Sequence, residues 1–136
     1  MWRTRLPLPP PHPHSLSAGA CLAALQAAHG IDGISITTHG ACAALLAADG
    51  SLAAPVLDYE HTGPDDMAAA YDALRPDFAQ TGSPRLPMGL NLGAQLHWQF
   101  ATDPTLIGRT ATIVTYPQYW GFRLTGKTAT DVMGPS

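Results

Sequence analysis

The clearest hydrophobic pattern in the chain covers residues 33–50. Apolar and polar residues alternate over residues 34–37, where isoleucine is followed in turn by serine, isoleucine and threonine. This period of two is typical of a strand with one buried face. Polar residues at 38–40 interrupt the pattern, a second apolar run follows at 42–46, and residues 48–50 close that run with a hairpin-type turn. The pattern predicts two short strands that meet at a polar junction, a place where sheet proteins commonly hold ligands.

The other elements follow from helical spacing, capping residues and prolines. A serine at position 15 or 17 is a suitable cap for a helix that reaches about residue 28, and Gly30 is a suitable stop. Further helices are predicted at residues 67–74, after the turn at 63–66, at residues 89–100 with Asn91 as a cap, and at residues 116–124. Residues 111–115 are β-rich, residues 52–57 suit an edge strand or an extended connection, and residues 78–87 are predicted to form a loop.

The charge of the chain argues against two classes of partner. The net charge is −3, and the seven Lys and Arg residues are scattered without a run. Nucleic acids and anionic membranes favour clustered basic residues, so neither is an expected partner. No apolar run approaches the roughly 20 residues that span a bilayer. Cys21 and Cys42 form no metal or disulfide framework and are interpreted as buried small hydrophobes, which makes cytoplasm the expected compartment.

Residues 1–16 differ from the remainder of the chain. They are rich in proline and carry no core pattern. Such a segment samples polyproline II or is disordered. We therefore expect an arm at residues 1–16 and one folded unit at residues 17–136.

Three groups of residues are candidates for chemistry. His39 lies beside Gly40, where the backbone can approach a ligand closely, and it is either a donor or base for a hydroxyl or simply bonded to a neighbouring carbonyl. Asp58, Glu60 and His61 are either an acid–base or metal cluster or a solvated loop, and their spacing matches no specific metal motif. The aromatic residues within 116–122 form either a stacking surface for a sugar ring or part of the core. The sequence contains no Gly-rich phosphate loop and no complete catalytic set, so no catalytic and no metal residue is predicted.

Four segments, in order, resemble one enzyme family. They are ISITTHG with the DG that follows it (34–50), PVLDYE (55–60), GLNLGAQLHW (89–98) and YPQYWGFRLTG (116–126). They are similar to the first, sugar-binding lobe of the FGGY carbohydrate kinases, in the branch of the rhamnulokinases and fuculokinases. The resemblance covers roughly residues 18–131. His39 stands where that branch has an aromatic residue, and Gln118 stands where the family has an aspartate.

This resemblance implies an α/β fold, as part of an actin-like, ribonuclease-H-like sugar-kinase lobe. It implies transfer of the γ-phosphoryl group of ATP to a sugar hydroxyl, with Mg²⁺. By position, it also implies sugar contacts from three parts of the chain. The residues concerned are Thr38, His39 and Gly40 at the junction, Asp58, Tyr59 and Glu60 after the next run, and Asn91 and Gln95 on the helix.

The family pattern is incomplete in this sequence. Its D-x-G-T phosphate-binding turn does not occur in residues 1–17, and its catalytic aspartate and nucleotide-binding lobe have no counterpart. We therefore expect a fragment that holds no ATP or Mg²⁺ and turns over no ATP by itself. The alternative is a non-catalytic remnant that acts as a binding or protein-interaction module. In either case an exposed sheet edge is expected to favour self-association.

Overall fold

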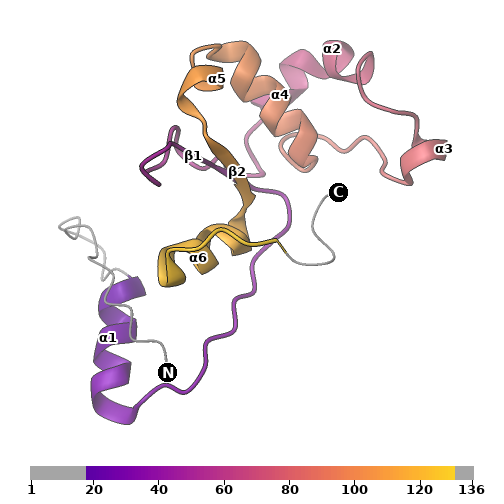
Figure 1. The fold of residues 1–136 in the computed structure, drawn as a ribbon. Helices are drawn as coiled ribbons and strands as arrows, with labels where there is room; N and C mark the ends of the chain where they lie inside the picture. The colour runs from indigo at the N-terminus through magenta and orange to yellow at the C-terminus, as the bar shows by residue number, and fades with distance from the viewer. Residues whose placement is uncertain (1–17, 131–136) are drawn as a thin grey trace.

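The computed structural model describes residues 18–130 (Figure 1). The proline-rich arm expected at residues 1–16 lies outside this range. The elements, in chain order, are α1 (Ala18–His29), β1 (Ala43–Leu46), the 3-10 helix η1 (Gly63–Met67), α2 (Ala68–Asp72), α3 (Phe78–Thr81), α4 (Leu92–Thr102), α5 (Leu106–Arg109), β2 (Thr112–Thr115) and α6 (Tyr116–Thr125).

A small antiparallel sheet lies at the centre of the molecule. β1 pairs with β2, and Ala43 is aligned with Thr115 and Leu46 with Thr112. Figure 1 shows α2, α4 and α5 on one side of the sheet and α6 and α1 on the other. The structure therefore confirms the predicted mixed α/β class and both apolar runs, at residues 42–46 and 111–115, as strands.

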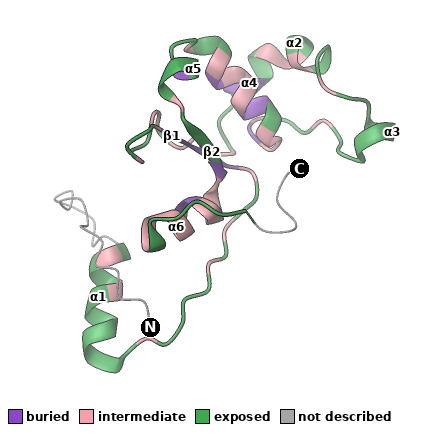
Figure 2. Cartoon of the chain, in the orientation of Figure 1, coloured by how far each residue is buried: buried purple, intermediate pink, exposed green. Residues whose placement is uncertain are grey.

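The hydrophobic core lies where the sheet meets α6. Ala44, Leu46, Val114 and Tyr119 form a buried cluster, and it is completed by Val56, Tyr116 and Phe122. All four residues of β1 are buried, so both faces of this strand are covered (Figure 2). Burial on both faces explains why β1 is a continuous apolar run without alternation.

The predicted turn at residues 48–50 is confirmed. The N–H of Gly50 donates to Ala47 O at 2.9 Å, and the N–H of Ala47 donates to Ser51 O at 2.8 Å. Gly50 has a φ of 81°, and a Cβ at this position would lie 2.8 Å from Cζ of Phe122. Glycine is therefore required here both by backbone conformation and by the close approach of α6.

The strand predicted at residues 34–37 is absent. In the described chain, the backbone of residues 33–40 makes no backbone–backbone hydrogen bond, and the segment belongs to no helix or strand. A strand needs a partner for its N–H and C=O groups, and residues 18–130 provide none beside this segment. Ile34 is 52% exposed and Ile36 is only partly covered, so the buried face predicted from the alternation is not formed within the described residues either.

Other boundaries differ less from the predictions. The predicted loop at 78–87 contains one turn of helix, α3, and α5 was not predicted, because elements of four residues carry no periodic signal. Asn91 precedes α4 but makes no capping bond with its side chain. Within residues 18–130, no helix combines the length and apolar character that crossing a bilayer requires.

The two cysteines differ in exposure. Cys42 is 2% exposed, as predicted, and its thiol donates to Leu57 O at 3.0 Å. Cys21 is exposed, so the prediction of burial was wrong for this residue. The reason is that α1 buries none of its residues, although its composition is apolar (Figure 2).

This difference predicts unequal thiol reactivity. Burial raises the pKa of the Cys42 thiol, and contacts with the Tyr59 backbone and the Gln95 side chain oppose that rise only in part. The thiolate is the reactive form, so Cys42 should resist alkylation. We expect titration of the native chain with a thiol-specific dye to show one rapid thiol, and a second one only in urea. Cys21→Ser should remove the rapid phase, whereas two rapid thiols in the native chain would contradict the buried position of Cys42.

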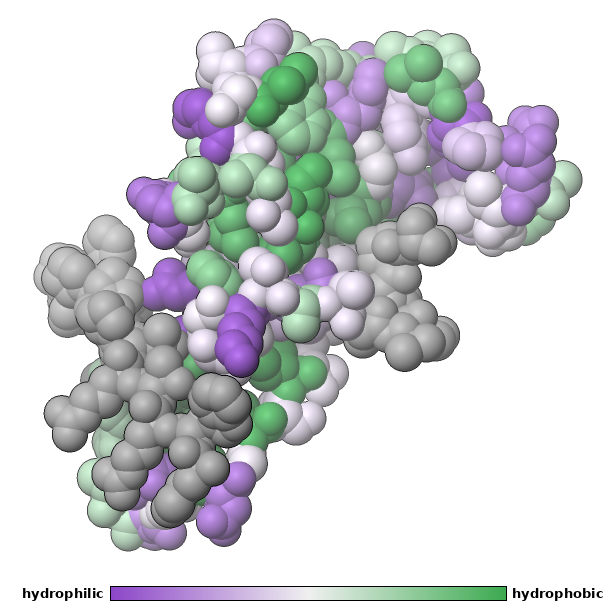
Figure 3. All heavy atoms as spheres, viewed as in Figure 1, coloured by the Kyte–Doolittle hydropathy of each residue, from purple (hydrophilic) through white to green (hydrophobic). Residues whose placement is uncertain are grey.

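An apolar area is exposed elsewhere on the molecule. Figure 3 shows hydrophobic side chains over β2 and α5, where Ile113 is 45% and Ile107 is 70% exposed. Both line a shallow hollow together with Phe100.

Candidate functional site

His39 lies at the centre of the candidate site. Its ring lies 4.9 Å from that of Tyr59, centroid to centroid, in an edge-on arrangement. It also stacks on Tyr116 at 5.5 Å, with 22° between the ring planes. His39 is itself exposed, so an imidazole and two phenol groups meet at the surface. These groups donate and accept hydrogen bonds, which is the chemistry that recognises a hydroxyl-rich ligand.

The sheet register brings Tyr116 to His39. Ala43 is aligned with Thr115, and the N–H of Tyr116 donates to Cys42 O at 3.0 Å, one step beyond the strands. The first residue of α6 is thereby placed opposite the chain that enters β1. The start of α6 is held by a capping box, in which the N–H of Thr115 donates to Oε1 of Gln118 at 3.0 Å.

Gln95 joins the three predicted parts of the site. It is fully buried on α4, and its Nε2 donates to the carbonyl oxygens of Ala41 and Gly89. A Cβ on Gly89 would lie 3.1 Å from the carbonyl oxygens of both Asp58 and Tyr59. The 38–41 junction, residues 58–59 and α4 therefore converge on one amide group. Oε1 of Gln95 is buried without a hydrogen-bond partner in the described chain.

The polar run after residue 57 forms a loop with local hydrogen bonds. Oδ1 of Asp58 accepts from the N–H of Glu60 at 2.9 Å, and both residues are exposed. Nδ1 of His61 accepts from the N–H of Gly63 at 2.8 Å, and its ring packs on Trp98 at 4.8 Å. His61 is thus engaged in structure, which agrees with the loop hypothesis. Residues 18–130 contain no group of three or more His, Cys, Asp or Glu side chains placed to hold a metal ion.

Asn91 does not point its amide into this site. Its Nδ2 donates to Pro84 O at 3.1 Å, and its Oδ1 accepts from the N–H of Leu86 at 2.7 Å. The side chain holds the loop before α4 instead. Of the predicted positions, the structure brings His39 into contact with Tyr59, and Gln95 holds the end of the junction at Ala41. Thr38 and Gly40 adjoin His39 in the chain, Asp58 adjoins Tyr59, Glu60 is exposed, and Asn91 is bonded to the loop before α4.

Tyr116 belongs to the aromatic run at 116–122, for which the sequence left a stacking surface and a place in the core both open. The aromatic run was interpreted mainly as core, and this holds for Tyr119, which is 8% exposed. Tyr116 differs because it is the first residue after a strand. This position at the end of a β-rich run is the sequence signal that distinguishes Tyr116 from the buried aromatic residue Tyr119.

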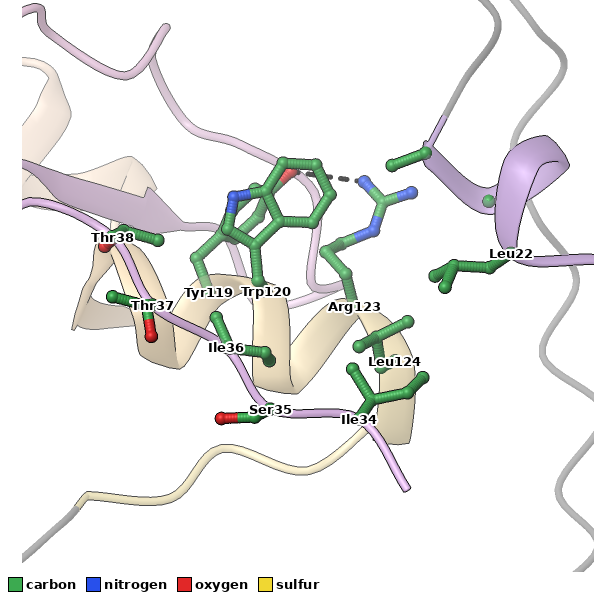
Figure 4. Close-up of a pocket in the computed structure, with 12 residues that line it drawn as sticks. Leu22, Ile34, Ser35, Ile36, Thr37, Thr38, Tyr119, Trp120, Arg123 and Leu124 are labelled. Carbon is green, nitrogen blue, oxygen red and sulfur yellow. Dashed lines mark hydrogen bonds between the residues drawn. The ribbon is translucent and has the colours of Figure 1, made fainter. Parts of the chain in front are cut away.

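A hollow lies beyond Thr38, on the other side of the junction. It has a volume of about 430 Å³ and lies between α1, residues 34–38 and α6 (Figure 4). Its walls are mainly apolar, and among the described residues that line it Arg123 is the one that carries a charge.

Comparisons with known proteins agree with the resemblance to carbohydrate kinases. No family model matches the chain, and no curated protein matches it. The structure is similar to the crystal structure of a carbohydrate kinase from Novosphingobium aromaticivorans, with a TM-score of 0.73 and 40% sequence identity. The similarity covers 82% of this chain and 24% of the kinase, so the chain spans about a quarter of the length of that protein. The α/β fold of residues 18–130 is therefore that of part of a carbohydrate-kinase lobe.

Proposed function

We propose that the chain forms part of the sugar-binding lobe of an FGGY-type carbohydrate kinase, and that His39 contacts the sugar. The observation that carries this proposal is the 40% identity to a carbohydrate kinase over most of the chain. The cluster of His39, Tyr59 and Tyr116 supports it, because these side chains offer hydrogen-bonding groups at an exposed position. As part of this proposal, we place the protein in the cytoplasm.

The proposed sugar contacts follow the geometry of the cluster. His39 and the backbone of Gly40 form its centre, Thr38 and Tyr59 flank it, and Asp58 lies at its edge as a charged acceptor. Thr38 already donates from Oγ1 to His39 O at 3.0 Å, which helps to set the junction backbone. Gln95 acts as a positioning residue, because it is buried and holds the junction by hydrogen bonds.

The described residues do not fit ATP and Mg²⁺. They contain neither a set of metal-ligating side chains nor a Gly-rich phosphate turn at a helix start. We therefore assign sugar contact alone to these residues and derive no phosphoryl-transfer step from them.

The test is sugar binding by the intact chain. Saturation-transfer NMR with a panel of aldoses, ketoses and polyols should reveal at least one binder. We expect His39→Ala to weaken binding at least about tenfold, since it removes the central donor and ring. His97→Ala is the matched control. His97 lies on α4 and packs on Tyr71 of α2, away from the cluster, so its replacement should leave sugar binding unchanged.

Two outcomes would contradict the proposal. One is that no sugar in the panel binds saturably to the folded chain. The other is equal binding by the His39→Ala variant and the parent chain, which would place any sugar site elsewhere.

A second candidate function is that of a protein-interaction module. The unpaired backbone of residues 33–40 favours it, because such a segment can accept a strand from another chain. This function does not require a sugar and is compatible with the first.

A further inference from the structure

The ring of His39 has little support from its own segment. Residues 33–40 form no backbone–backbone hydrogen bond within the described chain, and the side chain of His39 is exposed. Segments with few hydrogen bonds and few buried contacts are the ones that move most readily. Within residues 18–130, the aromatic rings in contact with the imidazole are those of Tyr59 and Tyr116. The orientation of His39 therefore depends on these two neighbours.

Tyr116 is held more firmly than His39. Its N–H donates to Cys42 O at 3.0 Å, and it is the first residue of α6, which begins with the capping box of Thr115 and Gln118. Figure 1 shows β2 leading directly into this helix. The side chain of Tyr116 also packs against the hydrophobic core. Sheet, helix and core together fix the position of Tyr116, which makes it a rigid support for a ring that packs on it.

A row of nearly parallel rings connects His39 to the core. The ring planes of His39 and Tyr116 differ by 22°, and those of Tyr116 and Tyr119 differ by 10° at a centroid distance of 6.3 Å. Tyr119 is 8% exposed, and its hydroxyl accepts a hydrogen bond from Arg123 (Figure 4). The row thus runs from an exposed imidazole through a half-buried tyrosine to a buried one that is itself anchored.

The side-chain contacts of Tyr116 are made by its ring. Its hydroxyl forms no hydrogen bond within residues 18–130, whereas the ring stacks on His39 and meets the ring of Trp120 edge-on at 6.1 Å. Stacked and edge-on aromatic pairs are favourable beyond the apolar area that they bury. What Tyr116 supplies to the site is therefore a fixed aromatic surface beside the imidazole.

We propose that Tyr116 is a positioning residue, whose ring holds the imidazole of His39 in the orientation that contacts the sugar. The sugar contact rests on the proposed function, whereas the holding of the ring does not. Tyr59, the second neighbour, lies in a turn outside every helix and strand of the described chain and is the less rigid support. An imidazole that is already oriented loses less conformational entropy when a ligand binds, so the affinity is higher.

The first test is NMR of the full chain without sugar. Nuclear Overhauser contacts should join the ring protons of His39 and Tyr116, and the His39 signals should carry the ring-current shift of a stacked neighbour. Tyr116→Leu should abolish that shift. Tyr116→Phe should keep it, because the substitution removes the hydroxyl and leaves the ring.

The second test is the affinity for any sugar that the parent chain binds. Tyr116→Leu should weaken binding about three- to tenfold, the range expected for the loss of one aromatic pair. Tyr116→Phe should stay within about twofold of the parent chain.

Phe122→Leu is the matched control on the same helix. Phe122 also packs against the core, but its ring lies against Gly50 and makes no ring contact with His39 in the described chain. Its replacement should leave both the His39 signals and the sugar affinity unchanged. Circular dichroism of each variant shows whether the fold is retained, so that a lost contact is not confused with unfolding.

Three results would overturn the proposal. They are a folded parent chain without contacts between the two rings, a Tyr116→Leu variant with unchanged His39 signals or sugar affinity, and a Tyr116→Phe variant that binds as weakly as Tyr116→Leu. The last result would mean that the hydroxyl of Tyr116 contacts the sugar directly. Failure of every sugar to bind would contradict the proposed function, and the NMR signals of His39 would still decide whether Tyr116 holds its ring.

Discussion

Replacing Gln95 with leucine is expected to lower the free energy of unfolding by about 2 to 4 kcal/mol. Leucine has nearly the same size, so little volume is lost. The amide is fully buried, however, and it is the donor to the carbonyl oxygens of Ala41 and Gly89. Without it, these two acceptors stay desolvated and unpaired, and each such group costs about 1 to 3 kcal/mol.

Gln99 provides a close control on the same helix. It is 5% exposed, and its Nε2 is buried without a partner in the described chain. Gln99→Leu removes an unsatisfied group and is expected to change stability by no more than about 1 kcal/mol, or to raise it. Urea denaturation of both variants, followed by far-UV circular dichroism, measures the difference. Equal destabilisation by the two substitutions would mean that the hydrogen bonds of Gln95 add no measurable free energy of unfolding.

Gln95→Leu should also disturb the site. The Ala41 carbonyl follows His39 by two residues, and releasing it frees the junction from α4. If a sugar binds at His39, the variant should bind it more weakly while still folded at low temperature. A stable Gln95→Leu chain with unchanged binding would remove Gln95 from the positioning of the site.

Leu46→Ala is expected to lower the free energy of unfolding by about 2 to 5 kcal/mol. Leu46 is 2% exposed and belongs to the cluster that joins the sheet to α6. Its truncation leaves a cavity that rigid neighbours fill only in part, so contacts are lost as well as apolar burial. The loss should appear as a lower midpoint in urea with little change in slope.

Leu74→Ala makes the same chemical change at an exposed position. Leu74 is 72% exposed, so its replacement is expected to alter stability by no more than about 0.5 kcal/mol. A similar loss in both variants would contradict the assignment of the core to β1, β2 and α6.

Local sequence signals determined most of the elements. The apolar runs at 42–46 and 111–115 form strands, Gly50 forms the turn after β1, and Pro117 lies in the first turn of α6. These features depend on backbone preferences and side-chain period within a few residues, which is information that a sequence carries directly. His39 was singled out for the same reason, because it lies beside a glycine at a break in the pattern.

Pairing and burial were decided by the tertiary structure. Alternation at residues 34–37 predicts an apolar face, but a strand also needs a neighbour, and no neighbour exists within residues 18–130. Cys21 lies in an apolar helix and is still exposed, because within residues 18–130 no element buries a residue of α1. Hydrophobic composition states what can be buried, whereas burial requires a second surface.

The composition of the candidate site also depended on long-range contacts. Tyr116 reaches His39 only through the register of β1 on β2, and Gln95 joins three segments only because α4 packs against them. The sequence by itself determined where strands and helices form and which residue stands at the junction. Which side chains surround that residue was decided by the fold, because contacts between residues more than 50 positions apart leave no periodic mark on the chain.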